Sequence, residues 1–328
     1  MRKSFQEIVN VIFPTGKIKR NNVLVFLDKS NFVDHQQTKD VFTDKWEQYE
    51  KEKAKEKKNF YDFQKKWYLD LYGFSSEEDL KFYLSKKKVI LDAGCGLGYK
   101  TKWLADLSPN SLIIGMDYSD SVFLAASNYK DTDNLLFVKN DIANTCLKNN
   151  SVDYISCDQV IHHTESPPRT FDEFYRILKP GSELAVYVYA KKALPRELVD
   201  DYFRKQTQYI PKEKMWKFSE QLTELGKCLS KINVNIEVPN LDLLGIKGGK
   251  MDLQRFIYWN FLKCFWSDKL GKQTSVFINY DWYSPTSAYR YSKEEFEQLL
   301  IDANFKVKKY HSEEACHSGR FERNKEKI

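Results

Sequence analysis

The chain has 328 residues and a net charge of +6, from 52 lysines and arginines against 46 aspartates and glutamates. Apolar residues make up 42% of the chain and charged residues 30%, which is ordinary for a folded globular protein and excludes a disordered one. The lysines mostly alternate with glutamates, so the charge gives no clear sign of nucleic-acid binding. No apolar run approaches the length that spans a bilayer.

The cysteines and the first residues indicate where the protein works. The six cysteines form no CxxC pair and show no zinc-ligand spacing, so we expect reduced thiols and no metal site. Residues 1–25 lack the long apolar stretch of a secretory leader. These features predict a cytoplasmic protein, and the sequence leaves a homo-oligomer open.

Residues 1–85 are predicted to form an N-terminal leader and a helical cover. Asn22–Leu27 has the composition of a strand, and Gly16 before it is a turn signal. Aromatic and apolar residues then recur at helical spacing through two segments. Gly73 is expected to end the second helix.

Residues 86–190 alternate short apolar runs with helical segments, which is typical of a doubly wound α/β fold with a mainly parallel sheet. The expected strands are Val89–Leu91, Leu112–Met116, Leu135–Val138, Val152–Ser156 and Glu183–Tyr189. The expected helices are Tyr99–Leu107, Ser121–Tyr129 and Pro168–Leu178.

The alternation then stops, and residues 191–285 are predicted to be a helical insertion that caps the substrate. Pro211–Ile232 has helical periodicity, and Met251–Trp266 is a second, unusually aromatic candidate helix. Its aromatic side chains would either pack in the core or face a substrate as a lid. Residues 286–328 are expected to complete the core. They contain a helix over Ser292–Ala303, with Ser292 and Glu295 as a capping pair, and a strand over Phe305–Tyr310.

A glycine-rich turn follows the first expected strand of this core. It reads Asp92-x-Gly94-x-Gly96-x-Gly98 and leads into a helix. Glycines let backbone pass close to a ligand, and this turn belongs at the carboxyl edge of the strands, where ligands bind. A dinucleotide-binding turn would read GxGxxG and hold a pyrophosphate. A carboxylate before the glycines suits instead a cofactor with an ammonium group and no phosphate, such as S-adenosylmethionine (SAM).

Two further acidic positions support this interpretation. Asp117 ends the second strand, about twenty residues beyond the turn, where a carboxylate can accept both ribose hydroxyls. Asp141 follows the third strand and can accept from an adenine amino group, with Ile142 packing on the ring. In order and at these intervals, the three features predict one cofactor site.

At these positions the chain resembles the class I SAM-dependent methyltransferases. Asp92–Gly98 resembles their first motif, Met116–Asp117 their ribose-binding position and Asp141–Ile142 their adenine-binding position. Asp153–Thr164 is similar to their fourth-strand motif, and Leu178–Gly181 resembles the turn before their fifth strand. Ser182 departs from the second glycine of that turn. Within the superfamily the chain looks closest to the type 11, ubiquinone-biosynthesis-like branch that acts on small molecules.

The resemblance implies a seven-stranded Rossmann-like sheet and S-adenosyl-L-methionine as cofactor. It adds Cys95 and Tyr118 to the cofactor site, and Asp158 as a contact of the cofactor's methionine end or of the substrate. Some relatives carry an N-terminal zinc ribbon, but no cysteine precedes Cys95 here. Asp281, Trp282 and Tyr283 would line the substrate pocket or, alternatively, cap the last helix.

His162 and His163 follow the fourth strand, at the pocket edge of the sheet. Methyl transfer to a hydroxyl needs a base, and histidine can take a proton near neutral pH. Both histidines are therefore candidate catalytic residues, although they could also only pack or bond the loop. The sequence predicts transfer of a methyl group to O or N of a small-molecule or sugar-containing acceptor. The alternatives are an RNA or protein methyltransferase, or a non-catalytic SAM-binding protein.

Overall fold

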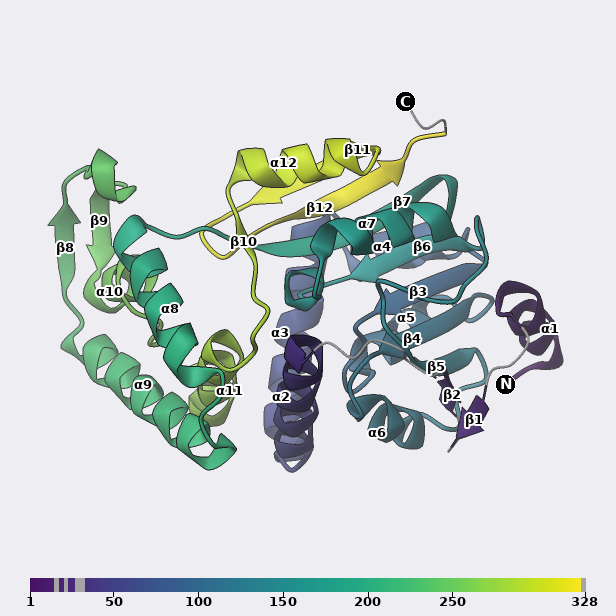
Figure 1. Cartoon of the computed structure of the whole chain (residues 1–328), viewed down its shortest axis with the longest axis horizontal. Coiled ribbons are helices and arrows are strands. Elements are labelled where there is room, and N and C mark those ends of the chain that lie inside the picture. Colours follow the sequence, from purple (N-terminus) through teal and green to yellow (C-terminus); the bar gives the residue numbers. More distant parts are fainter. Residues whose placement is uncertain (15–17, 21–22, 27–32, 326–328) are drawn as a thin grey trace.

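The computed structural model describes residues 1–14, 18–20, 23–26 and 33–325. Its centre is a ten-stranded sheet in the order β1-β2-β5-β4-β3-β6-β7-β12-β11, with β10 beside β7 (Figure 1). Across the sheet the strands are β1 (Ile18–Arg20), β2 (Val23–Val25), β5 (Leu135–Lys139), β4 (Leu112–Asp117), β3 (Val89–Ala93), β6 (Val152–Cys157), β7 (Leu178–Ala190), β12 (Cys316–Arg323), β11 (Phe305–Ser312) and β10 (Arg290–Tyr291).

The strands from β2 to β7 are parallel, as the alternation of strands and helices predicts. β12 runs antiparallel to β7, and β11 antiparallel to β12. The seven strands from β5 to β11 confirm the expected Rossmann-like sheet, and β1, β2 and β10 extend it to ten. Of the strand expected at its N-terminal edge, Val23–Val25 forms β2, whereas Asn22, Leu27 and Gly16 lie outside the described residues.

Helices cover both faces of the sheet, which is why every residue of β3 is buried. One face packs against α1 (Lys3–Ile12), α7 (Pro167–Ile177) and α12 (Lys293–Asp302). The other packs against α3 (Ala54–Tyr72), α4 (Glu77–Leu84), α5 (Tyr99–Leu107) and α6 (Ser121–Asn128). The carboxyl edge of the strands stays free of these layers, and the functional residues gather there.

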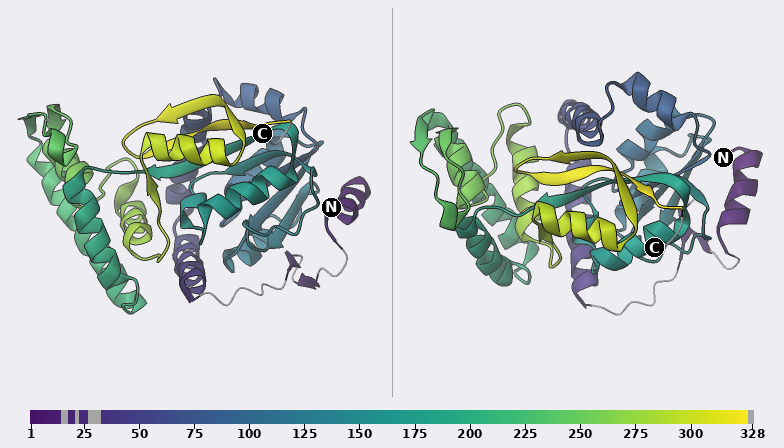
Figure 2. Two further views of the ribbon diagram at one scale, coloured as in Figure 1. Left: turned by 45° about the horizontal axis from the view of Figure 1, so that its top comes forward. Right: turned by 90° about the horizontal axis from the view of Figure 1, so that it is seen from above.

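A largely helical insertion leaves the sheet after β7 and returns at β10. In chain order its elements are α8 (Leu194–Thr207), α9 (Lys212–Ile232), β8 (Asn235–Val238), β9 (Gly249–Asp252), α10 (Leu253–Asn260) and α11 (Gly271–Tyr283). α9 and the β8–β9 hairpin lie on the side of the molecule opposite to α1 (Figure 2). α2 (Val33–Glu50) packs against both α11 and α6, so the N-terminal part bridges the insertion and the sheet.

One expected helix is wrong over half of its length. Met251–Trp266 was predicted as one helix, but α10 ends at Asn260 and the chain then continues without regular structure. Side chains hold the irregular segment in place. Gln254 donates to the Cys264 carbonyl oxygen (3.0 Å), and the Asn279 amide bonds both the N–H (2.8 Å) and the carbonyl oxygen (3.1 Å) of Phe265.

Other boundaries agree with the sequence. Gly73 ends α3 in the left-handed conformation (φ +66°). Ser292 and Glu295 form the expected capping box at the start of α12. α8 is an addition, since no periodicity predicted it. No helix in the described part of the chain contains a stretch long and apolar enough to cross a membrane.

Candidate functional site

A cavity of about 390 Å³ lies between the carboxyl edge of the sheet and the insertion. That volume is within the range of small-molecule sites. Eleven of the predicted site residues line it: Asp92, Gly94, Cys95, Asp117, Tyr118, Asp141, Ile142, Asp158, His163, Asp281 and Trp282. The structure does not bring Gly96, Gly98, His162 or Tyr283 to the cavity wall.

The glycine turn between β3 and α5 has a backbone that only glycine adopts easily. Gly94 (φ +82°), Gly96 (φ +52°) and Gly98 (φ +76°) are all left-handed. A Cβ on Gly94 would lie 2.4 Å from the Val160 side chain, and one on Gly96 would lie 3.0 Å from the Trp46 ring. The glycines are therefore required by local conformation and packing inside the protein, in addition to any approach of a ligand.

The two carboxylates next to this turn are held in fixed positions. Asp92 is buried and accepts a hydrogen bond from the Thr101 hydroxyl (2.7 Å). Asp117 accepts from the Gly96 N–H (2.7 Å) and from the N–H (2.8 Å) and hydroxyl (2.6 Å) of Ser119. Burial raises the pKa of both carboxyl groups above their usual values. A cationic or hydroxyl-bearing ligand would restore the solvation that these groups lose.

The third predicted cofactor position follows β5. Asp141 accepts a hydrogen bond from the Ala143 N–H (2.8 Å), so its side chain is fixed within its own turn. Ile142 is 5% exposed, and it both lines the cavity and belongs to the hydrophobic core. An apolar side chain is thus present where adenine packing was expected.

Asp158 has protein partners on both carboxylate oxygens. The Tyr72 hydroxyl donates to Oδ1 (2.7 Å), and the Lys100 ammonium forms an ion pair with Oδ2. Burial acts to lower the pKa of Lys100, but Asp158 and Asp92 outweigh it, so the pKa is raised and the amine stays charged. Asp158 therefore neutralises Lys100, a role that the sequence did not indicate.

The two histidines differ in their surroundings. His163 lines the cavity, and its Nδ1 lies 2.7 Å from the Ser287 carbonyl oxygen. Because a carbonyl can only accept, Nδ1 carries the proton and Nε2 carries the lone pair. Burial lowers the pKa of His163 to about 4, so the ring is neutral at physiological pH.

His162 lies behind this layer. It is fully buried, its ring centroid lies 3.8 Å from that of Tyr189 with the two rings tilted, and its Nδ1 is 3.3 Å from the Tyr187 carbonyl oxygen. Burial, with His163 beside it, lowers the pKa of His162 well below the usual value. The packing role that the sequence left open for one histidine fits His162.

The predicted substrate residues end α11. Asp281 forms an ion pair with Lys45 (2.5 Å), and Trp282 presents its ring to the cavity. The Tyr283 hydroxyl points away to Asp200 (2.6 Å). None of the three caps the last helix, because Ser292 does so.

Sequence reasoning missed a set of cations on the cavity wall. Besides Lys100 they are Lys39, Lys45, Lys192, Arg196, Arg255 and Lys263. The only signal for them was the interleaving of Arg255 and Lys263 with the aromatic residues of the 251–266 stretch. These residues come together only through the fold.

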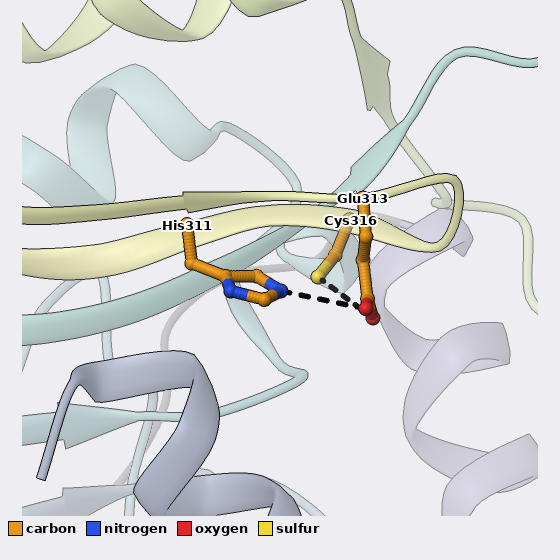
Figure 3. A group of neighbouring side chains, drawn as sticks. All are labelled: His311, Glu313 and Cys316. Carbon is orange, nitrogen blue, oxygen red and sulfur yellow. Dashed lines mark hydrogen bonds and ion pairs between the residues drawn. The ribbon is translucent and has the colours of Figure 1, made fainter. Parts of the chain in front are cut away.

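A separate cluster lies on the β11–β12 hairpin, where His311, Glu313 and Cys316 point toward one another (Figure 3). His311 Nε2 is 3.4 Å from Glu313 Oε2, and the Cys316 thiol is 3.8 Å from Oε1. Glu313 therefore contacts both of the other side chains, and burial raises the pKa of the Cys316 thiol. The expectation of no metal site remains a prediction.

Comparison with known proteins identifies the class of the core. Residues 91–186 match the family model described as a methyltransferase domain. The chain is 29% identical over 102 residues to sterol 24-C-methyltransferase erg6 of Schizosaccharomyces pombe, covering 30% of this chain and 27% of that protein. It is 30% identical over 129 residues to demethylmenaquinone methyltransferase of Symbiobacterium thermophilum, covering 37% of this chain and 50% of that protein.

Among solved structures, a SAM-dependent methyltransferase of Methanosarcina mazei aligns with a TM-score of 0.42 and 14% identity, over 74% of this chain and 94% of that one. The chain spans a quarter to a half of the length of the curated relatives it matches. Residues 91–186 therefore form a methyltransferase domain with the class I fold, and S-adenosyl-L-methionine is the cofactor that this domain implies.

Proposed function

We propose that the whole protein is a SAM-dependent methyltransferase that transfers a methyl group to O or N of a small-molecule acceptor. The observation that carries this proposal is one cavity that holds both the acidic cofactor positions of the core and the neutral ring of His163. Each of the four parts predicted from the sequence would have a role, with residues 286–328 completing the core. The core would hold the cofactor, and the N-terminal cover and the insertion would enclose the acceptor.

The donor set at the carboxyl edge fits this cofactor. Asp92, Asp117 and Asp141 supply carboxylate oxygens for ammonium, ribose and adenine donors, and Ile142 supplies an apolar surface. A pyrophosphate at the glycine turn would be repelled by the Asp92 carboxylate. When bound, the cofactor supplies an electrophilic methyl group on a sulfonium. The protein's own task is then to orient the acceptor and to exclude water.

His163 is the residue best placed to handle the acceptor's proton. Its Nδ1–H is fixed on the Ser287 carbonyl, so Nε2 can accept a hydrogen bond from an acceptor hydroxyl or amine. A His163→Ala variant should keep its SAM affinity and lose turnover. Full turnover of that variant would discard the role of base.

Two other functions remain as outcomes of experiment. An RNA or protein methyltransferase would label macromolecules, and a non-catalytic SAM-binding protein would bind SAM without turnover. Incubation with labelled SAM and host metabolite extract, followed by mass spectrometry, separates these outcomes. The same spectra show whether the methyl group is on O, on N or, as the name sterol 24-C-methyltransferase states for that relative, on C.

Calorimetry with SAM tests the cofactor site first. Asp117→Ala removes the acceptor expected for the ribose hydroxyls and loosens its bonds to Gly96 and Ser119, so SAM affinity should fall about tenfold or more. Asp106→Asn, an exposed change on α5, is the control and should bind as the wild type does. Unchanged affinity in Asp117→Ala would remove Asp117 from the site, and no binding by the wild type would overturn the proposal.

A further inference from the structure

Once the ion pairs Lys39–Asp120, Lys45–Asp281 and Lys100–Asp158 are set aside, the remaining charges on the cavity wall are divided between its two sides. The carboxylates of the cofactor positions lie at the carboxyl ends of β3 and β4 and just after β5 in the core. Cations line the insertion side, at the start of α8, on α10 and just after it: Lys192, Arg196, Arg255 and Lys263. An uneven distribution of this kind selects ligands with opposite charges at their two ends.

Lys263 is the most informative of these cations. Lys263 is 6% exposed. Its Nζ donates to the Tyr258 hydroxyl (3.1 Å) and lies 4.4 Å from the centre of the Trp282 ring. No carboxylate within the described residues comes within ion-pair distance of it. A buried ammonium without a counter-charge is costly, and the three aromatic rings near it, Tyr258, Phe265 and Trp282, offset only part of that cost.

The neighbouring cations add to this excess of positive charge. Arg255 lies 5.4 Å from the Tyr258 ring centre, and its guanidinium has no carboxylate partner in the part of the chain that is described. Lys192 donates to the carbonyls of Ala190 and Glu314, which hold the amine without neutralising it. Burial, with Arg196 and Lys263 nearby, lowers the pKa of Lys192 to about 7.

Arg196 differs from the neighbouring cations because it has a carboxylate partner. Its Nε donates to Asp200 Oδ2 (2.7 Å), and both residues are fully buried. The same Asp200 accepts from the Trp282 indole N–H (2.8 Å). Arg196 is therefore structural, whereas Lys263 and Arg255 face the cavity without such a partner.

A row of aromatic rings links these cations to the proposed base. The His163 ring is 5.5 Å from the Tyr189 ring, which is 4.7 Å from the Trp282 ring, on whose face Lys263 lies. All four residues line the cavity. A ligand lying along these rings would have one end at His163 Nε2 and the other at Lys263.

We infer that the insertion side of the cavity binds an anionic group of the acceptor, a carboxylate or a phosphate on an apolar or aromatic body. Lys263 and Arg255 hold the anion, and Tyr189 and Trp282 contact the body. This inference rests on the proposed function for the identity of the ligand as acceptor, but anion binding can be measured without turnover.

The test uses four probes that share a phenyl ring and differ in their polar group: benzoate, phenyl phosphate, benzyl alcohol and benzylamine. Each is titrated into the full-length protein saturated with S-adenosylhomocysteine, with binding followed by ligand-observed NMR. An anionic probe should bind about tenfold or more tightly than benzyl alcohol, with benzylamine weakest. The better of benzoate and phenyl phosphate identifies the anion as carboxylate or phosphate. Equal binding of anion and alcohol would overturn the inference.

Variants locate the site. Lys263→Gln and Arg255→Gln should each weaken the anion about tenfold, while Lys263→Arg keeps the charge and most of the binding. Lys250→Gln, an exposed change on β9, is the matched control. If Lys263→Gln does not fold, Arg255→Gln and the probe preference of the wild type decide the question. An anion that binds the two Gln variants as tightly as the wild type would overturn the inference.

The cofactor's own carboxylate is the competing occupant, and SAM titration distinguishes it. If Lys263→Gln and Arg255→Gln weaken SAM itself about tenfold, these cations serve the cofactor and the inference is wrong. If SAM does not bind the wild type but the anionic probe does, the proposed function fails and the anion site remains.

Discussion

At the scale of single residues, the sequence could predict those parts of the site whose chemistry is local. Asp92 and Asp117 lie at the carboxyl ends of their strands and Asp141 just after the next one, so their meeting at one edge of the parallel sheet follows from the fold class. The role of Lys263 could not be found in this way, because Tyr258 and Phe265 are near it in sequence but Tyr189 and Trp282 come from other segments. Its surroundings depend on tertiary packing that no spacing encodes.

A prediction at this scale concerns His163. Its pKa in the folded protein is about 4, below the usual value of 6.5, so between these values the unfolded chain binds the proton more tightly. The stability that His163 contributes is present above pH 6.5 and is lost as pH falls toward 4. From about pH 7 to about pH 5 this amounts to a loss of about 2 kcal/mol.

Urea unfolding at the two pH values measures this loss in the wild type and in His163→Gln. The variant should show a correspondingly smaller pH dependence of its unfolding free energy. His311→Gln, on the β11–β12 hairpin, is the control and should keep the wild-type dependence. An identical dependence in wild type and His163→Gln would contradict the burial argument.

At the scale of elements, periodicity predicted the helices and strands of the core, and it was wrong where side chains bind backbone groups. The aromatic pattern of Met251–Trp266 continues past Asn260. The helix nevertheless ends, because Gln254 and Asn279 satisfy the backbone of the following segment. These contacts join residues 10 and 14 positions apart, which a helical pattern cannot reveal.

The packing of α9 on this irregular segment gives the prediction for this scale. A Cβ on Gly226 would lie 2.2 Å from the Cys264 carbonyl oxygen, which is backbone and cannot move aside cheaply. Glycine to alanine in an exposed helix interior usually stabilises by about 1 kcal/mol. Here Gly226→Ala should instead destabilise by about 1–3 kcal/mol, because it overpacks a buried contact.

Chemical denaturation checks that sign, with Gln221→Ala on the exposed face of α9 as the control. Since Lys263 precedes Cys264, the shifted segment should also weaken the anionic probe. If Gly226→Ala is stabilised, the irregular segment that contains Cys264 can shift without loss of stability, and its packing against α9 does not fix its position.

At the scale of the whole molecule, the core was predictable because one family of motifs runs through it, whereas the arrangement of the insertion was not. The fold nevertheless predicts how the core and the insertion act together in binding. Core carboxylates and insertion cations line one cavity of about 390 Å³, so cofactor and anion should bind together rather than compete. A ligand at about one hundred times its Kd stabilises the folded state by about 2.7 kcal/mol.

Thermal unfolding measures the stabilisation of the same protein by each of the two ligands. SAM and the better anionic probe should each raise the unfolding temperature, and their effects should add because they contact different sides of the cavity. Asp117→Ala should show a smaller SAM shift and an unchanged anion shift, and Lys263→Gln should do the reverse. If saturating anion abolished the SAM shift in the wild type, both ligands would share one subsite, and the division of the cavity between core and insertion would be wrong.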